Sequence, residues 1–265
     1  MITPILMLGA GRMGGAMIEG WRRAGAFPAA ELMIRDPEPG PAARAAAEAG
    51  AVLDPADASL ARARTVVLAV KPQIWRGAAA ETAGWLSADA VIVSICAGVK
   101  TADIAKAFGG RCTARVMPTT AAAIGRGTAS LYADDPAALS RAHALFEPLG
   151  AVVDLTDEAL MHAATAVSGS SPAYLYAFIE ALEAAGVGAG LGRAEAQRLA
   201  RSTIAGAAAL LAETGDDPGD LRRQVTSPGG TTQAALDVLL AAGALPDLLR
   251  EAVAAAVRRS KALGA

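Results

Sequence analysis

The pattern of apolar residues divides the chain into two parts near residue 156. Before this point, short unbroken apolar runs alternate with mixed segments. Such runs are typical of strands that are buried on both faces of a parallel sheet. They predict an α/β domain with a doubly wound sheet. The expected strands are residues 5–8, 31–35, 51–53, 65–70, 90–95, 112–117, 128–132 and 151–155.

From Asp157 onward the strand-like runs disappear, and the pattern predicts helices only. The expected helices are residues 158–166, 173–185, 194–213, 218–224, 232–241 and 245–263. Their apolar faces carry little charge and would be exposed to water in a monomer, so we expect a homodimer built on these helices. A self-contained helical bundle is the alternative. The sequence thus predicts one domain at 1–156 and an all-α dimerisation domain at 157–265.

The first apolar run leads directly into Gly9-x-Gly11-x-x-Gly14 and a helical pattern at residues 13–23. In dinucleotide-binding folds the first glycine allows a tight turn, the second lets backbone approach the pyrophosphate, and the third lets helix and strand pack closely. The phosphates lie at the helix N-terminus. The motif alone is weak in a chain rich in alanine and glycine, but its position after the first strand favours an N-terminal Rossmann domain.

The end of the second strand bears on which dinucleotide binds. Asp36 would accept hydrogen bonds from a ribose 2′-hydroxyl, whereas Arg35 together with Arg12 would clamp a 2′-phosphate. Asp36-Pro37 is also compatible with the start of a simple turn. We expect NADPH as the cofactor, with NADH as the alternative.

The carboxyl ends of the strands should form the rest of the cofactor site, because ligands of doubly wound sheets bind there. Lys71 is of special interest, since it lies between a strand end and a proline. The expected cofactor-binding residues are Gly9, Gly11, Arg12, Met13, Gly14, Arg35, Asp36, Ala69, Val70, Lys71, Pro72, Ala97, Met117 and Pro118.

Two interruptions in the helical half carry more hydroxyl groups than helix capping requires. They are residues 165–174, with Thr165 and Ser168, and residues 225–233, with Ser227, Thr231 and Thr232. Hydroxyls and free backbone amides beside a helix start suit a small anion such as a carboxylate.

Composition excludes several other functions. The net charge of −2 offers no basic surface to nucleic acid, and no apolar stretch is long enough to span a membrane. His143 and His162 lack partners at metal-ligand spacing, so we expect no metal site. Cys96 and Cys112 lie in separate strand-like runs, and no signal peptide is evident, so we expect a cytoplasmic protein.

The motifs at these positions resemble those of the pyrroline-5-carboxylate reductase family over nearly the whole chain. The loop at 225–232 and Thr-Ala-Val-Ser-Gly-Ser at 165–170 are far more specific than the glycine motif. The remaining matches are Ala-Val-Lys-Pro-Gln at 69–73, Ser-Ile-Cys-Ala-Gly at 94–98 and Arg-Val-Met-Pro at 115–118.

The resemblance implies reduction of the cyclic imine 1-pyrroline-5-carboxylate to L-proline by NAD(P)H, the last step of proline synthesis. It implies that Thr165 hydrogen-bonds near the imine nitrogen, and that Lys71 lies beside the nicotinamide and takes part in catalysis. It further implies a pocket shared between subunits, and dimers that assemble into larger rings. The residues implied to bind the substrate are Ser168, Ser227, Gly229, Gly230, Thr231 and Thr232.

Four positions depart from the family pattern. Thr119 replaces a common asparagine, Ser171 a glycine, His162 an aspartate and Arg12 an asparagine. These changes leave two alternatives open. One is a paralogous reductase of another cyclic imine or a small keto acid. The other is a non-catalytic NADP(H)-binding regulatory protein, against which the retained hydroxyl-rich loops argue.

Overall fold

The structure is a computed structural model that describes residues 2–263, and these form two compact units. The first unit runs to Gly169 and includes the residues from Ala256 onward, and the second unit is Ser170–Ala255. This division falls later than the boundary predicted at residue 156. The reason is that Met161 and Ala166 are buried in the first unit, against β6 and β7.

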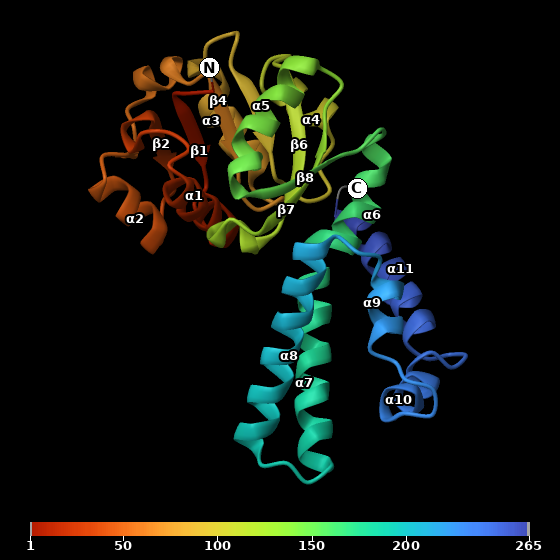
Figure 1. The fold of residues 1–265 in the computed structure, drawn as a ribbon. Helices are drawn as coiled ribbons and strands as arrows, with labels where there is room; N and C mark the ends of the chain where they lie inside the picture. The colour runs from red at the N-terminus through yellow and green to blue at the C-terminus, as the bar shows by residue number, and fades with distance from the viewer. Residues whose placement is uncertain (1, 264–265) are drawn as a thin grey trace. The chain divides into compact units, whose positions relative to one another are not determined.

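An eight-stranded sheet forms the centre of the first unit, in the order β3-β2-β1-β4-β5-β6-β7-β8 (Figure 1). The first six strands are parallel, β7 is antiparallel to β6, and β8 is parallel to β7. The predicted strands and the Rossmann fold are confirmed. The bounds are β1 (Ile5–Leu8), β2 (Leu32–Arg35), β3 (Val52–Leu53), β4 (Thr65–Leu68), β5 (Val91–Ser94), β6 (Thr113–Pro118), β7 (Gly127–Tyr132) and β8 (Gly150–Asp154).

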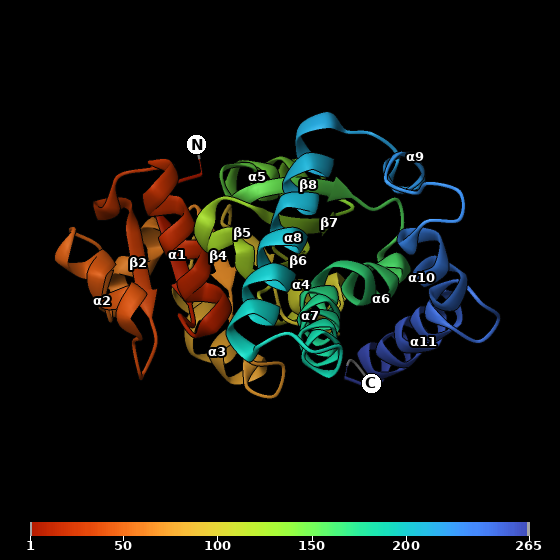
Figure 2. The same cartoon turned by 60° about the horizontal axis from the view of Figure 1, so that its bottom comes forward.

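Helices cover both faces of this sheet (Figure 2). One core contains side chains of α1 (Arg12–Ala24), α2 (Pro41–Glu48) and α5 (Pro136–Phe146). The opposite core contains side chains of α3 (Trp75–Thr82) and α4 (Thr101–Ala107), two short helices that the sequence pattern did not predict. Burial on both faces explains why the central strands are almost entirely apolar.

The second unit is helical. The antiparallel helices α7 (Ser171–Gly188) and α8 (Arg193–Thr214) lie side by side (Figure 1). They are followed by α9 (Pro218–Gln224), α10 (Thr231–Leu239) and α11 (Leu245–Leu263), whose last turns belong to the first unit. Large apolar side chains remain exposed on α7 and α8, among them Leu175, Tyr176, Phe178, Leu182, Leu199 and Leu210. Among residues 2–263, no helix has the length and apolar character needed to cross a membrane.

His143 links helix α5 to strand β8 on the surface of the first unit. Its Nε2 lies 2.8 Å from Asp154 Oδ1, and its Nδ1 lies 3.0 Å from Glu147 Oε1. Partial burial by itself lowers the pKa of His143, but the two carboxylates outweigh burial, so the net pKa is raised. The imidazolium is therefore favoured in the folded protein.

This link predicts a pH-dependent contribution to stability. A raised folded pKa means that the stabilisation is fully present below about pH 6.5, the ordinary histidine pKa, and is lost as pH rises through the folded pKa. We expect His143→Gln to lower the free energy of unfolding by under about 1 kcal/mol in acid and by less in base. Urea unfolding at about pH 5.5 and about pH 8.5 measures this difference. An equal loss at both pH values would contradict the assignment.

Candidate active site

The glycine turn after β1 has the shape that a pyrophosphate requires. Gly9 has φ +91°, and a Cβ atom there would lie 2.8 Å from the carbonyl oxygen of Ala69. A Cβ atom on Gly14 would lie 2.6 Å from the carbonyl oxygen of Gly9, whereas a Cβ atom on Gly11 would face open space. The first and third glycines are thus required for close packing, and the second leaves the helix N-terminus accessible to phosphate.

A groove of about 550 Å³ extends from this turn along helix α1. Its volume fits part of a dinucleotide, and Arg12 supplies a positive charge in its lining. The predicted position of Arg12 at the cofactor is therefore compatible with the structure. The lining residues are Ala10, Gly11, Arg12, Gly15, Ala16, Glu19, Glu38, Gly40, Pro41, Ala42 and Thr120.

Asp36 and Arg35, at the end of β2, are both engaged within the protein. The Asp36 carboxylate accepts hydrogen bonds from the amide of Ala10 at 2.5 Å and from the amide of Glu38 at 2.8 Å, so it fixes the glycine turn. Arg35 donates through Nη2 to the carbonyl oxygen of Pro55 at 3.0 Å and also pairs with Asp57. Sequence reasoning missed Asp57, which belongs to a poorly patterned segment after β3.

The carboxyl ends of β4, β5 and β6 lie next to one another because these strands are parallel and adjacent. This arrangement brings the predicted segments 69–72 and 117–118 together with Ala97 at one edge of the sheet. Lys71 is exposed there. Cys96 is buried with its sulfur 3.2 Å from the carbonyl oxygen of Val70, and burial raises the pKa of its thiol to about 11. The thiol is therefore neutral and unreactive at this edge.

The segment with Thr165 lies against the same edge. A Cβ atom on Gly169 would lie 3.3 Å from the Met117 side chain. Residues Thr165–Gly169 form a π-helical turn, a rare geometry that occurs frequently at functional sites. The Thr165 hydroxyl donates to the carbonyl oxygen of Met161 at 2.7 Å, and the Ser168 hydroxyl donates to that of Ala164 at 2.8 Å. A hydroxyl oxygen that donates its proton can still accept a hydrogen bond through its lone pairs.

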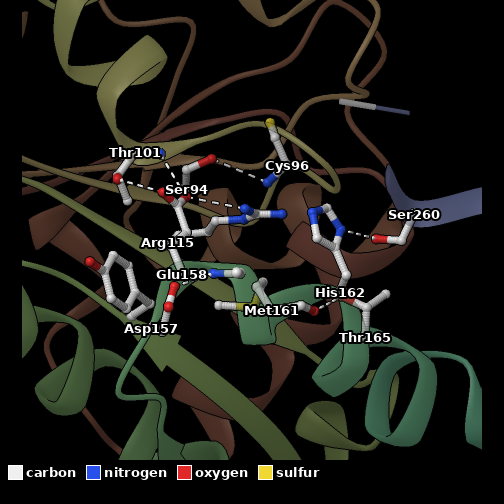
Figure 3. A network of polar contacts seen from close by, with 12 residues as sticks. Ser94, Cys96, Thr101, Arg115, Asp157, Glu158, Met161, His162, Thr165 and Ser260 are labelled. Carbon is white, nitrogen blue, oxygen red and sulfur yellow. Dashed lines mark hydrogen bonds and ion pairs between the residues drawn. The ribbon is translucent and has the colours of Figure 1, made fainter. Parts of the chain in front are cut away.

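A polar network lies beneath this segment (Figure 3). The buried Arg115 side chain donates through Nη1 to Glu158 Oε1 at 3.1 Å. The same carboxylate accepts from the amide of Thr101 at 2.8 Å and from its hydroxyl at 3.1 Å. His162 Nδ1 lies 2.9 Å from the hydroxyl oxygen of Ser260 in the last turns of α11. The sequence signal for this network was a charged residue, Arg115, inside an apolar strand.

In the second unit, the loop between α9 and α10 has free donors at a helix start. Gly229 has φ +70°, and the amide of Gly230 donates to the carbonyl oxygen of Ser227 at 3.0 Å. The first amides of α10, from Thr231 onward, have no intrahelical acceptor. A groove of about 360 Å³ adjoins the loop and is lined by Arg222, Arg223, Thr226, Gln233, Leu236, Asp237 and Leu240. Such a loop can bind a carboxylate.

Two of the unusual positions have structural partners. The Thr119 hydroxyl oxygen accepts a hydrogen bond from the amide of Thr128 at 2.9 Å, so this side chain ties β6 to β7. His162 contacts Ser260 as described above. Across the described part of the chain, no three His, Cys, Asp or Glu side chains are grouped so that they could hold a metal ion.

These features define a class of protein, a dinucleotide-dependent oxidoreductase with an N-terminal Rossmann domain followed by a helical domain. Residues 4–98 match the family model "NADP oxidoreductase coenzyme F420-dependent", and residues 158–263 match "Pyrroline-5-carboxylate reductase dimerisation". The second match begins close to the predicted domain boundary, whereas the compact helical unit begins at Ser170.

The relatives agree with both matches. The chain is 39% identical to the pyrroline-5-carboxylate reductase of Pseudomonas aeruginosa, over 99% of this chain and 98% of the relative. It is 44% identical to that of Synechocystis, over 75% of this chain and 74% of the relative. A pyrroline-5-carboxylate reductase structure from Coxiella burnetii matches with a TM-score of 0.90 and 30% identity over 100% of both chains. A pyrroline carboxylate reductase structure from Plasmodium falciparum with NADP bound matches with a TM-score of 0.85 and 26% identity. This match covers 99% of this chain and 98% of the other.

The chain belongs to the pyrroline-5-carboxylate reductase family. It is an NAD(P)H-dependent reductase that converts 1-pyrroline-5-carboxylate to L-proline, as the motifs predicted. The match to the NADP oxidoreductase model supports NADPH, the cofactor expected from the sequence. The match to the dimerisation model supports a homo-oligomer.

The surroundings of His162 predict an unusual titration. Burial lowers its pKa, and the positive charges of Arg115 and Lys261 lower it further. The chain has only two histidines, so NMR of the imidazole ring hydrogens should resolve two titrations. We expect one midpoint below and one above the ordinary value of about 6.5. His143→Gln should remove the higher midpoint, and loss of the lower one instead would contradict the assignment.

Proposed function

We propose that the edge formed by Ala97, Met117 and Pro118 holds the nicotinamide and that Thr165 holds the imine nitrogen. Bound NADPH supplies the hydride for the electrophilic carbon of the substrate. No strong acid is required if the imine enters already protonated. The observation that carries this proposal is the close approach of Gly169 to Met117, where an added Cβ atom would lie 3.3 Å from the Met117 side chain. This approach places the Thr165 segment against the strand ends.

The role of Thr165 follows from its hydrogen bond. Its proton is donated to the carbonyl oxygen of Met161 at 2.7 Å, so its oxygen is oriented as an acceptor. An acceptor suits the N–H of a protonated imine and stabilises the positive charge that draws electrons toward nitrogen. An alcohol could not act as the general acid, because its pKa is far too high. Thr165 therefore positions the iminium and does not protonate it.

This role predicts the effect of two substitutions. Thr165→Ala removes a hydrogen bond to a charged group and should lower kcat by about 10- to 100-fold, with the KM for NADPH nearly unchanged. Thr165→Ser keeps the hydroxyl and should retain most of the activity. Steady-state oxidation of NADPH with 1-pyrroline-5-carboxylate measures both. Unchanged turnover in Thr165→Ala would contradict the role.

We assign the substrate carboxylate to the loop Ser227–Thr232, with Ser227, Gly229, Thr231 and Thr232 as its donors. Its support is the set of free amides at the start of α10 and the two arginines in the adjoining groove. The amide of Gly230 already donates to the carbonyl oxygen of Ser227, so Gly230 contributes by shaping the loop. Ser168 is proposed to contact the substrate next to Thr165, and Lys71 to act beside the nicotinamide.

The proposed assembly is a homodimer that associates into a larger ring. Exposed apolar side chains on α7 and α8 support association between copies of the chain. Location in the cytoplasm stays a prediction.

The preference for NADPH is proposed to depend chiefly on Arg12. Arg12 lines the cofactor groove, whereas Arg35 is already paired with Asp57. The sequence predicted that Arg12 and Arg35 would bind the 2′-phosphate together. Because Arg35 is paired with Asp57, we propose that Arg12 provides most of this interaction.

Arg12→Ala should raise the KM for NADPH by about tenfold and leave that for NADH nearly unchanged, since it removes one charge-assisted contact to phosphate. Arg23→Ala, an exposed arginine in the last turn of the same helix, is the matched control and should change neither constant. Initial rates with each cofactor measure the four values. An equal rise in both constants would mean that Arg12 binds the pyrophosphate instead.

A further inference from the structure

Glu158 is bonded at once to strand β6 and to the start of helix α4. Its Oε1 accepts from Arg115 Nη1 at 3.1 Å and from the amide of Thr101 at 2.8 Å, while Oε2 accepts from the Thr101 hydroxyl at 3.1 Å. Figure 3 shows these three residues converging from different elements. One carboxylate therefore joins three separate segments of the first unit.

Each of these segments also carries a residue of the proposed site or lies next to one. Arg115 precedes Met117 by two residues on β6, and Thr101 follows the loop that contains Ala97. Glu158 itself begins the segment that contains Thr165. The Glu158 carboxylate thus connects the segments that carry the proposed nicotinamide site with the segment that carries Thr165.

The burial of Arg115 makes this link specific. The side chain of Arg115 is 2% exposed, and Nε and Nη2 have no hydrogen-bond partner among the described residues. Glu158 is therefore the counter-charge on which this guanidinium depends. A buried charge with a single ion-pair partner restricts that partner to one position far more than an exposed pair would.

We propose that Glu158 is a positioning residue for hydride transfer: by binding Arg115 and Thr101 together, it fixes the distance between the nicotinamide edge and Thr165. This inference rests on the site proposed above. Glu158 does not touch the substrate, and its effect is exerted through the three segments that it joins.

The test compares Glu158→Gln with Asp157→Asn. Glutamine keeps the shape and one acceptor oxygen, so it removes the charge with little change of volume. Asp157 is the adjacent exposed carboxylate, and it caps the amide of Ala159 at 2.7 Å. The asparagine side chain in the control variant retains an acceptor oxygen for this cap, so the control removes the same charge from the same turn.

In Glu158→Gln we expect kcat to fall about tenfold, because a misplacement of about 1 Å can cost about 100-fold and the displacement here is smaller, while the KM for NADPH stays within about twofold. The primary isotope effect with NADPH deuterated at nicotinamide C4 should rise as hydride transfer becomes rate-limiting. Asp157→Asn should change none of these. Unchanged kcat and isotope effect in Glu158→Gln would overturn the proposal.

A second readout uses the protein without cofactor. Amide hydrogen exchange should accelerate in Glu158→Gln both at the start of α4 and across residues 161–169, because a neutral amide oxygen holds Arg115 and Thr101 more weakly than the carboxylate does. Acceleration confined to residues 157–160 would overturn the proposal. This readout is independent of turnover, so it separates a failure of the positioning role from a failure of the proposed function, which Thr165→Ala tests.

The double variant Arg115→Met with Glu158→Gln separates positioning from stability. Removing both charges should restore much of the thermal stability that the single variant loses, since no uncompensated charge remains buried. If Glu158 is a positioning residue, kcat of the double variant should stay low, because without the Arg115 guanidinium strand β6 is not joined to Thr101. Recovery of kcat together with stability would show that Glu158 acts on stability alone and would overturn the proposal.

Discussion

The parallel register of β1, β4, β5 and β6 is the constraint on which the first unit depends. Parallel strands place all their carboxyl ends at one edge, and their burial on both faces fixes that edge rigidly. The chain then needs only short extensions from each strand to bring the glycine turn, segment 69–72, Ala97 and Met117 together. Positions far apart in sequence thus become neighbours without any bond between their side chains.

Polar groups add what the apolar sheet cannot provide, a defined place for the segment that carries Thr165. Apolar packing of Met161 and Ala166 against β6 and β7 buries area but is non-directional. The Arg115–Glu158 pair adds a directional constraint, because displacement would leave a buried guanidinium without its counter-charge, at a cost of about 3–5 kcal/mol. The π-helical turn at Thr165–Gly169 follows one short helix later, and its last residue, Gly169, lies close against Met117.

Much of this arrangement is readable from the sequence, for identifiable reasons. The central strands are buried on both faces and give unbroken apolar runs, and the more exposed edge strands β3 and β8 were found as well. Helices α3 and α4 were missed because they are short and rich in alanine, so no clear apolar stripe forms. The glycine turn was predicted because its residue requirements are local. The partners of Arg115 and Arg35 were not, because Glu158 and Asp57 reach them through the fold and leave no periodic signal.

The charged side chains around the glycine turn bear on the choice between NADPH and NADH. Asp36 uses its carboxylate to fix the glycine turn, yet it remains a negative charge near the expected ribose, and Glu19 and Glu38 line the groove nearby. With Arg35 paired to Asp57, the proposed site relies mainly on Arg12 to attract a 2′-phosphate against these acids. Arg12 is exposed, so salt screens its charge effectively. The pyrophosphate, by contrast, is proposed to bind backbone amides at a helix start, so we expect recognition of the 2′-phosphate to be the more sensitive of the two to ionic strength.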